Sequence, residues 1–209
     1  MHLIAKATVL AALLSSLPAA TVEGTITFEK AVPAGMLAWV PGVVRAAAPA
    51  PVSIDQKDKV FTPTVVAVRP GSTVTIRNSD GIQHNAYGSD KSANGTFDTG
   101  LNAPNSDTPL TVGWPAGKVV KLGCKIHPGM QMWIAALDSD AWVVPAGTAA
   151  APKIATFTIA DVPADAAKVV LWTSKYGELE LDLKASGSAT GSIGPAERPA
   201  ATVSVQRKP

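Results

Sequence analysis

Hydrophobic and polar residues alternate along many short segments of this 209-residue chain. The alternation is clear at residues 22–30, VEGTITFEK, and again around Val66 and around Val74. A period of two is typical of strands that bury one face. Between the last two segments, Pro70 sets φ for the first corner of a turn and Gly71 accepts positive φ at the next. This pair therefore predicts a hairpin-like turn.

Strand-like segments continue along the rest of the sequence, apart from a polar stretch at residues 88–108 that has no clear periodicity. Valine, threonine and alanine are frequent, and this composition favours short strands over long helices. Further strands are expected in PLTVGW (109–114), KVVKLGC (118–124), MWIAAL (132–137), KIATFTI (153–159), AKVVLWTS (167–174), GELELDL (177–183) and ATVSVQ (201–206). The pattern predicts an all-β protein.

Two stretches rich in alanine and proline, AAAPAP at 46–51 and PAGTAAAP at 145–152, are typical of linkers. The strands expected before residue 46 could belong to either of the domains that these stretches separate. We expect N-terminal strands and a linker at 21–50, one β domain at 51–137, a linker at 138–152 and a C-terminal β-sandwich at 153–209.

Residues 1–20 have the pattern of a secretory signal peptide. Lys6 supplies a positive charge, residues 7–14 are apolar, and small residues lead to a cleavage position near Ala20. The apolar run is too short to cross a bilayer, and no second long apolar segment follows. We expect an exported bacterial protein of the periplasm with no membrane span.

Charge and cysteine content narrow the possible functions. Only 16% of the residues are charged, the formal net charge is +2, and no Lys/Arg-rich run occurs, which argues against nucleic acid as a partner. Cys124 is the only cysteine and cannot form an internal disulfide. It is therefore an inert thiol, an intermolecular link, a nucleophile or a metal ligand.

A cysteine, a histidine and a methionine, all with side chains that can bind a metal ion, occur within the segment CKIHPGM, residues 124–130. Together with His84, it supplies two imidazoles, a thiolate and a thioether from His84, Cys124, His127 and Met130. This is the ligand set of a mononuclear blue-copper centre. Zinc is a weaker candidate because thioether is a poor zinc ligand and closed zinc sites use more thiolates or histidines. Met132 is an alternative to Met130, although the loop spacing favours Met130.

The segments NSDGIQHN (78–85) and CKIHPGM resemble the two ligand segments of cupredoxins, with the short ligand loop of amicyanin-like members. The resemblance covers residues 52–137 and implies a Greek-key β-sandwich or barrel that holds one type 1 copper. The longer pattern, with an added C-terminal β domain, resembles bacterial methylamine-utilisation-like or plastocyanin-like proteins. The resemblance implies His84, Cys124 and His127 as equatorial ligands and Met130 as the axial ligand.

Further residue roles follow from the same resemblance. Asn85 matches an asparagine that joins the two ligand segments by hydrogen bonds. The ring edge of His127 is expected in an exposed apolar patch that passes the electron, with Pro128, Trp133 and Met36 as candidate members. Gly129 departs from the family pattern, since many short-loop relatives carry an aromatic residue there, although a glycine also allows a tight bend.

We therefore expect a carrier of single electrons between periplasmic redox proteins, and not an enzyme. A second hypothesis is copper delivery, storage or sensing without electron transfer, and a third is a structural or adhesion role. A nucleophilic-cysteine enzyme would need an orienting third group, and none is recognisable beside Cys124 and His127.

Overall fold

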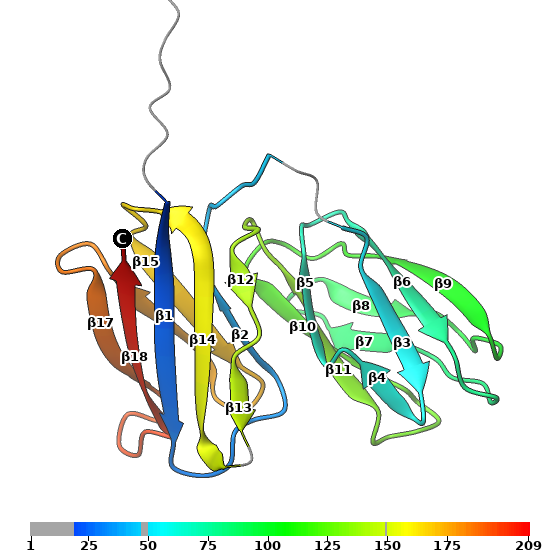
Figure 1. Cartoon of the computed structure of the whole chain (residues 1–209). Helices are drawn as coiled ribbons and strands as arrows, with labels where there is room; N and C mark the ends of the chain where they lie inside the picture. Colours follow the sequence, from blue (N-terminus) through cyan, green and yellow to red (C-terminus); the bar gives the residue numbers. More distant parts are fainter. Residues whose placement is uncertain (1–18, 47–49, 149) are drawn as a thin grey trace, which may run out of the picture.

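The computed structural model describes residues 19–46, 50–148 and 150–209 (Figure 1). Within these ranges the chain forms strands, turns and loops, and no helix. The all-β fold class expected from the alternation is confirmed. Most of the expected signal peptide, residues 1–18, lies outside the described residues, and Ala19 and Ala20 begin the first strand.

Both ends of the described chain form one β-sandwich, here called the terminal sandwich. Its outer sheet has the order β13 (Ala146–Thr148), β14 (Ala151–Pro163), β1 (Ala19–Phe28), β18 (Ala201–Lys208), β17 (Ser188–Ile193). Its second sheet has the order β12 (Trp142–Val143), β2 (Met36–Trp39), β15 (Lys168–Thr173), β16 (Gly177–Asp182). Because β1 pairs with both β14 and β18, the N-terminal strands belong to the same sandwich as the C-terminal ones.

The middle of the chain forms the second sandwich, here called the inserted sandwich. One sheet has the order β4 (Val60–Thr62), β3 (Ser53–Lys57), β6 (Thr73–Asn78), β9 (Ser106–Thr111). The other has the order β5 (Val65–Val68), β11 (Gln131–Ala136), β10 (Lys118–Gly123), β7 (Tyr87–Asp90), β8 (Gly95–Asp98). Each sandwich encloses its own hydrophobic core.

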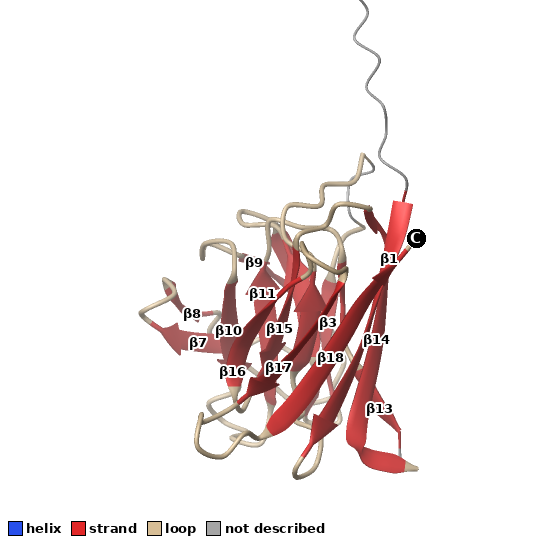
Figure 2. Ribbon diagram, turned by 90° about the vertical axis from the view of Figure 1, so that its left-hand side faces the viewer, coloured by secondary structure: helices blue, strands red, loops and turns tan. Residues whose placement is uncertain are grey.

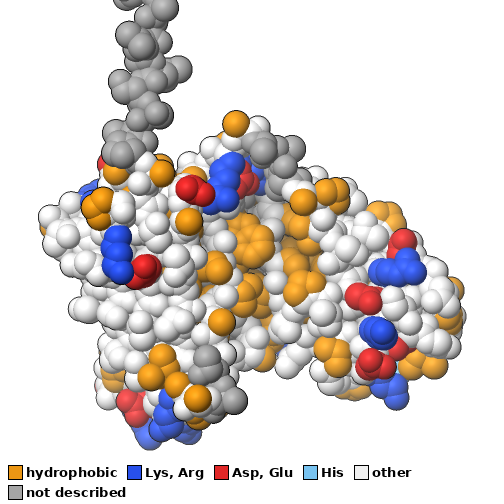
Figure 3. Space-filling model, in the orientation of Figure 1, with side chains coloured by type: hydrophobic (Ala, Val, Ile, Leu, Met, Phe, Trp, Pro, Cys, Tyr) orange, Lys and Arg blue, Asp and Glu red, His pale blue; other side chains and the backbone are white. Residues whose placement is uncertain are grey.

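A third hydrophobic cluster joins the two sandwiches face to face. It lies between β2 and β15 on one side and β5 and β11 on the other, so the four sheets are stacked (Figures 1 and 2). Trp133 of β11 and Trp172 of β15 meet there with ring centroids 6.0 Å apart. Arg69 and Asp140 add a two-pronged ion pair across the junction. Hydrophobic side chains also gather in the hollow between the sandwiches (Figure 3).

Strand β11 contributes side chains to two cores. Met132 and Ile134 point into the inserted sandwich, whereas Trp133 and Ala135 belong to the cluster between the sandwiches. All of its residues after Gln131 are therefore buried. This explains why MWIAAL is almost uniformly apolar instead of alternating.

Three segments differ from the sequence-based expectations. Residues 138–152, expected as a linker, carry β12, β13 and the start of β14, which pair with strands of the terminal sandwich. Residues 88–108 contain most of a polar hairpin, β7 and β8, at the edge of a sheet. Gly71 has the expected positive φ of 82°, but β5 and β6 lie in different sheets and form no hairpin.

Candidate metal centre

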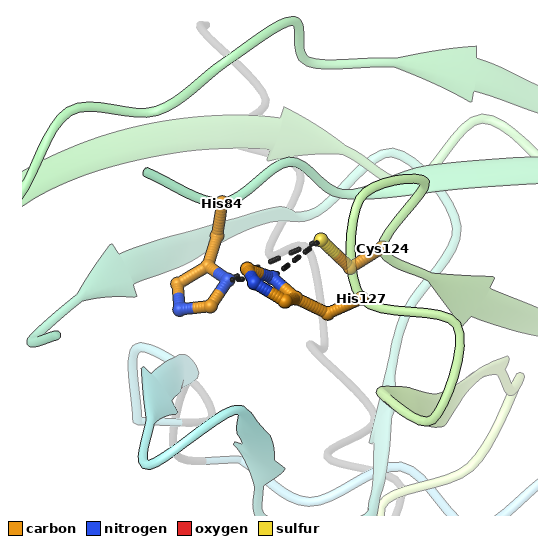
Figure 4. A group of neighbouring side chains, drawn as sticks. All are labelled: His84, Cys124 and His127. Carbon is orange, nitrogen blue, oxygen red and sulfur yellow. Dashed lines mark hydrogen bonds between the residues drawn. The ribbon is translucent and has the colours of Figure 1, made fainter. Parts of the chain in front are cut away.

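Three of the four predicted donor side chains meet at one end of the inserted sandwich (Figure 4). His84 lies between β6 and β7, Cys124 directly follows β10, and His127 lies in the loop between β10 and β11. Figure 4 shows both rings and the thiol turned toward one another. His84 and Cys124 are buried, and His127 is partly exposed.

The three donor atoms form a compact triangle. His84 Nδ1 lies 3.0 Å from His127 Nδ1, and Cys124 Sγ lies 3.9 Å and 3.7 Å from these two nitrogens. A point equidistant from the three atoms is about 2 Å from each, close to the ~2.0–2.3 Å of metal bonds to imidazole nitrogen and thiolate sulfur. The donors therefore fit a single metal ion without rearrangement.

His84 is fixed through both its backbone and its ring. Its backbone exchanges two hydrogen bonds with Asn102, in which His84 N donates at 3.2 Å and His84 O accepts at 2.6 Å. Its ring Nε2 lies 2.6 Å from Oδ2 of Asp80. A carboxylate only accepts, so Nε2 carries the proton and the lone pair of Nδ1 faces Cys124 and His127.

Asp80 is itself held by backbone donors. The N–H groups of Asp58 and Lys59 donate to its two carboxylate oxygens at 2.7 Å and 3.0 Å. The hydrogen bond from the Lys59 N–H is the main cause that lowers the pKa of Asp80 to about 2. Burial opposes this shift, but the hydrogen bonds from His84 and Asp58 lower the pKa further and burial is outweighed. Asp80 is therefore a carboxylate at neutral pH.

Buried amide side chains lie beneath the His84 segment. Asn78 Nδ2 donates to the carbonyls of Ile82, Asn102 and Ala103, and Gln56 Nε2 donates to the carbonyl of Asn85 at 3.0 Å. Asn78 and Gln56 are fully buried. Satisfied polar groups in a core hold the backbone in one arrangement, which keeps the His84 ring in place.

Asn85 joins the two donor segments. Its Oδ1 accepts the backbone N–H of Lys125, directly after Cys124, at 2.7 Å. Its Nδ2 donates to Oδ1 of Asp98 at 3.0 Å. Asp98 also pairs with the Lys125 ammonium, and this hydrogen bond is the main reason why the pKa of Asp98 falls to about 2. Asn85 therefore links residues 84–85 to the loop that starts at Cys124.

His127 is the one donor of the three that reaches the surface. Desolvation lowers its pKa, and repulsion from His84 and Lys59 lowers it further. Large exposed apolar side chains lie on the loops at this end of the sandwich: Ile82, Leu101 and Ile126 are 43%, 58% and 50% exposed. Pro128, next to His127, is also exposed.

Two residues considered for this patch lie elsewhere. Trp133 is buried between the two sandwiches, and Met36 is buried in the core of the terminal sandwich. Both side chains contribute to hydrophobic packing, because their strands, β2 and β11, are covered on both faces. Of the three candidates, only Pro128 is exposed beside His127.

The two methionines considered as a metal ligand, Met130 and Met132, both point into the core of the inserted sandwich. Met130 ends the ligand loop, its N–H donates to the carbonyl of His127 at 2.9 Å, and its side chain packs in the same cluster as Cys124. Met132 lies within β11, opposite Leu122 of β10. Gly129 does not have positive φ, and an added Cβ would meet nothing within 4 Å. The tight loop therefore does not require glycine at this position.

The sequence analysis gives no role to four residues that hold the donor segments: Gln56, Asn78, Asp80 and Asp98. Asn78 and Asp80 lie within the ligand-like segment 78–85, and Gln56 and Asp98 lie outside it. The only local signal was the spacing of four residues between Asp80 and His84, which also occurs by chance.

Some solved structures are similar in fold. A Cu-containing nitrite reductase (NirK) from Thermus scotoductus SA-01 is 23% identical, with a TM-score of 0.37, over 44% of this chain and only 23% of the reductase. A novel purple cupredoxin from Nitrosopumilus maritimus is 18% identical, with a TM-score of 0.34, over 41% of this chain and 98% of the cupredoxin. Amicyanin from Paracoccus versutus (Thiobacillus versutus) is 18% identical, with a TM-score of 0.36, over 53% of this chain and 96% of amicyanin.

All three likenesses cover part of this chain and have TM-scores below 0.5. No protein-family model matches the chain, and no curated protein matches it. None of the described residues forms a helix with the length and apolar character needed to cross a lipid bilayer.

Proposed function

We propose that this protein is a type 1 copper protein that carries single electrons between redox partners. The observation that carries the proposal is the convergence of two imidazole nitrogens and one cysteine sulfur on a single point. Thiolate is a soft ligand that favours Cu(I), and imidazole suits Cu(II). A mixed set therefore keeps both oxidation states accessible.

Copper would supply a one-electron redox couple. His84, Cys124 and His127 would hold the ion, with the Met130 thioether as a weaker ligand and Asn85 joining the two ligand segments. The amide side chains beneath His84 and the Asn85 bonds keep the donors in one geometry. Little movement is then needed when the charge of the ion changes, which favours fast electron transfer.

The surface supports a carrier over an enzyme. His84 and Cys124 are buried, so a substrate cannot reach the ion from their side. The partly exposed ring of His127 offers a short path to a docked protein, and Ile82, Leu101 and Ile126 provide an apolar surface around that end. The signal-like residues 1–20 favour the periplasm as the location, and we propose a periplasmic redox protein or enzyme as the partner.

Copper delivery, storage or sensing is the alternative function. A delivery protein must release its ion, which is easier when its donors are exposed or mobile. Here two donors are buried and one ligand segment rests on fully buried amides. This arrangement favours retention of the ion over its delivery, and voltammetry separates electron transfer from storage or sensing.

The visible spectrum of the copper-loaded protein tests the proposal. We expect one copper per chain by metal analysis and an intense thiolate-to-copper band at the red end of the visible spectrum. Cys124→Ser should abolish the band, and reversible voltammetry should show a one-electron couple. A colourless Cu(II) form, or a band unchanged by Cys124→Ser, would refute the assignment.

A further inference from the structure

An aspartate carboxylate lies behind the buried histidine of the site. Asp80 Oδ2 is 2.6 Å from Nε2 of His84, on the side of the ring opposite the donor nitrogen. The His84 side chain is fully buried, and the side chain of Asp80 is only 13% exposed. Little water therefore competes for this bond.

The position of Asp80 is set by a second segment of the chain. Asp58 and Lys59, in the turn between β3 and β4, both have positive φ, of 54° and 58°. This conformation directs their backbone N–H groups at the two oxygens of Asp80. With His84, the carboxylate has three donors and is locked in orientation.

We propose that Asp80 is a positioning residue for the metal centre, because its carboxylate holds His84 as the Nε2–H tautomer and strengthens Nδ1 as a donor. This inference rests on the proposed copper function. A negative partner on Nε2–H pushes electron density toward Nδ1, which favours the more highly charged ion. Asp80 should therefore stabilise Cu(II) relative to Cu(I) and lower the reduction potential.

The chain offers a matched control for this role. Asp107 of β9 also carries a carboxylate that accepts a charged hydrogen bond, from Arg77 at 3.2 Å, but its side chain is 54% exposed. Asp107→Asn removes one negative charge from a surface ion pair that does not hold the donor segments. Asp80→Asn removes the charge from the His84 bond and can keep one oxygen for Nε2.

Copper affinity and reduction potential are measured for the wild type and both variants. Loss of an outer partner of a ligating histidine typically weakens metal binding 10–100-fold, and we expect Asp80→Asn to weaken Cu(II) binding by about this factor. The potential should rise by about 59 mV for each tenfold by which Cu(II) binding weakens more than Cu(I) binding. Asp107→Asn should leave both quantities close to the wild-type values.

Nitrogen NMR of the copper-free wild type provides a readout that does not depend on loading or on variant folding. The His84 ring should be protonated at Nε2 and unprotonated at Nδ1. Protonation at Nδ1 instead, equal effects of Asp80→Asn and Asp107→Asn, or a wild-type affinity and potential in Asp80→Asn, would each overturn the role of Asp80. If the wild-type protein binds no copper, the proposed function is overturned as well. If the wild type is blue and Asp80→Asn changes neither the copper affinity nor the reduction potential, only this inference is overturned.

Discussion

Asn85→Ala is the sharpest test of how the donor segments are held together. The side chain of Asn85 is 3% exposed and makes two hydrogen bonds, one from the Lys125 backbone N–H and one to the Asp98 carboxylate. A neutral hydrogen bond contributes roughly 0.5–1.5 kcal/mol to stability, and one to a charged group roughly 1.5–3 kcal/mol. The variant should therefore lose about 2–4.5 kcal/mol of unfolding free energy.

Urea unfolding of the copper-free protein measures this loss, with an unchanged m-value as the sign that only stability has changed. Ser92→Ala is a suitable control. Ser92 also donates to a carboxylate, that of Asp90, but it is exposed in the turn between β7 and β8. The control should change the unfolding free energy by less than about 0.5 kcal/mol. A loss this small in Asn85→Ala would refute the idea that Asn85 joins the two segments.

Two further outcomes test the axial ligand and the junction between the sandwiches. Met130→Leu should keep copper bound and raise the reduction potential in voltammetry, whereas Met132→Leu should change the potential little; the reverse result would make Met132 the axial ligand. Trp133→Ala should destabilise the protein by about 3–5 kcal/mol in thermal or urea unfolding, because it empties a buried aromatic site. Its copper spectrum should stay as in the wild type, and a marked spectral change would place Trp133 at the metal site.

Strands could be predicted from the sequence where one face is buried and the other is exposed to solvent. Residues 22–30 and 201–206 alternate and form most of β1 and part of β18. The hairpin β7–β8 was missed because its residues are mostly polar or glycine. A Cβ at Gly88 would lie 2.5 Å from the Phe97 ring, so the ring packs against a position that has room only for glycine. A glycine at a buried position interrupts the alternation of hydrophobic and polar residues.

Pairing between distant strands was outside the reach of the pattern. The turn at Gly71 was expected to close a hairpin, yet β5 pairs with β11 and β6 pairs with β3 and β9. Alternation reports which residues of a strand are buried, but it carries no information about which strand lies beside it. The same limit applies to the linker expected at 138–152, because the short strands of this segment complete sheets formed by other parts of the chain.

The sequence by itself determined the chemistry of the donors. His84, Cys124 and His127 are rare residue types in this chain, and two of them lie in one short loop, so local spacing was sufficient to single them out. Only the tertiary structure decided what surrounds them: the Asp80 carboxylate behind His84, and a second sandwich over Trp133. These contacts join residues from different strands and loops, and their geometry depends on how whole sheets pack, which no short segment encodes.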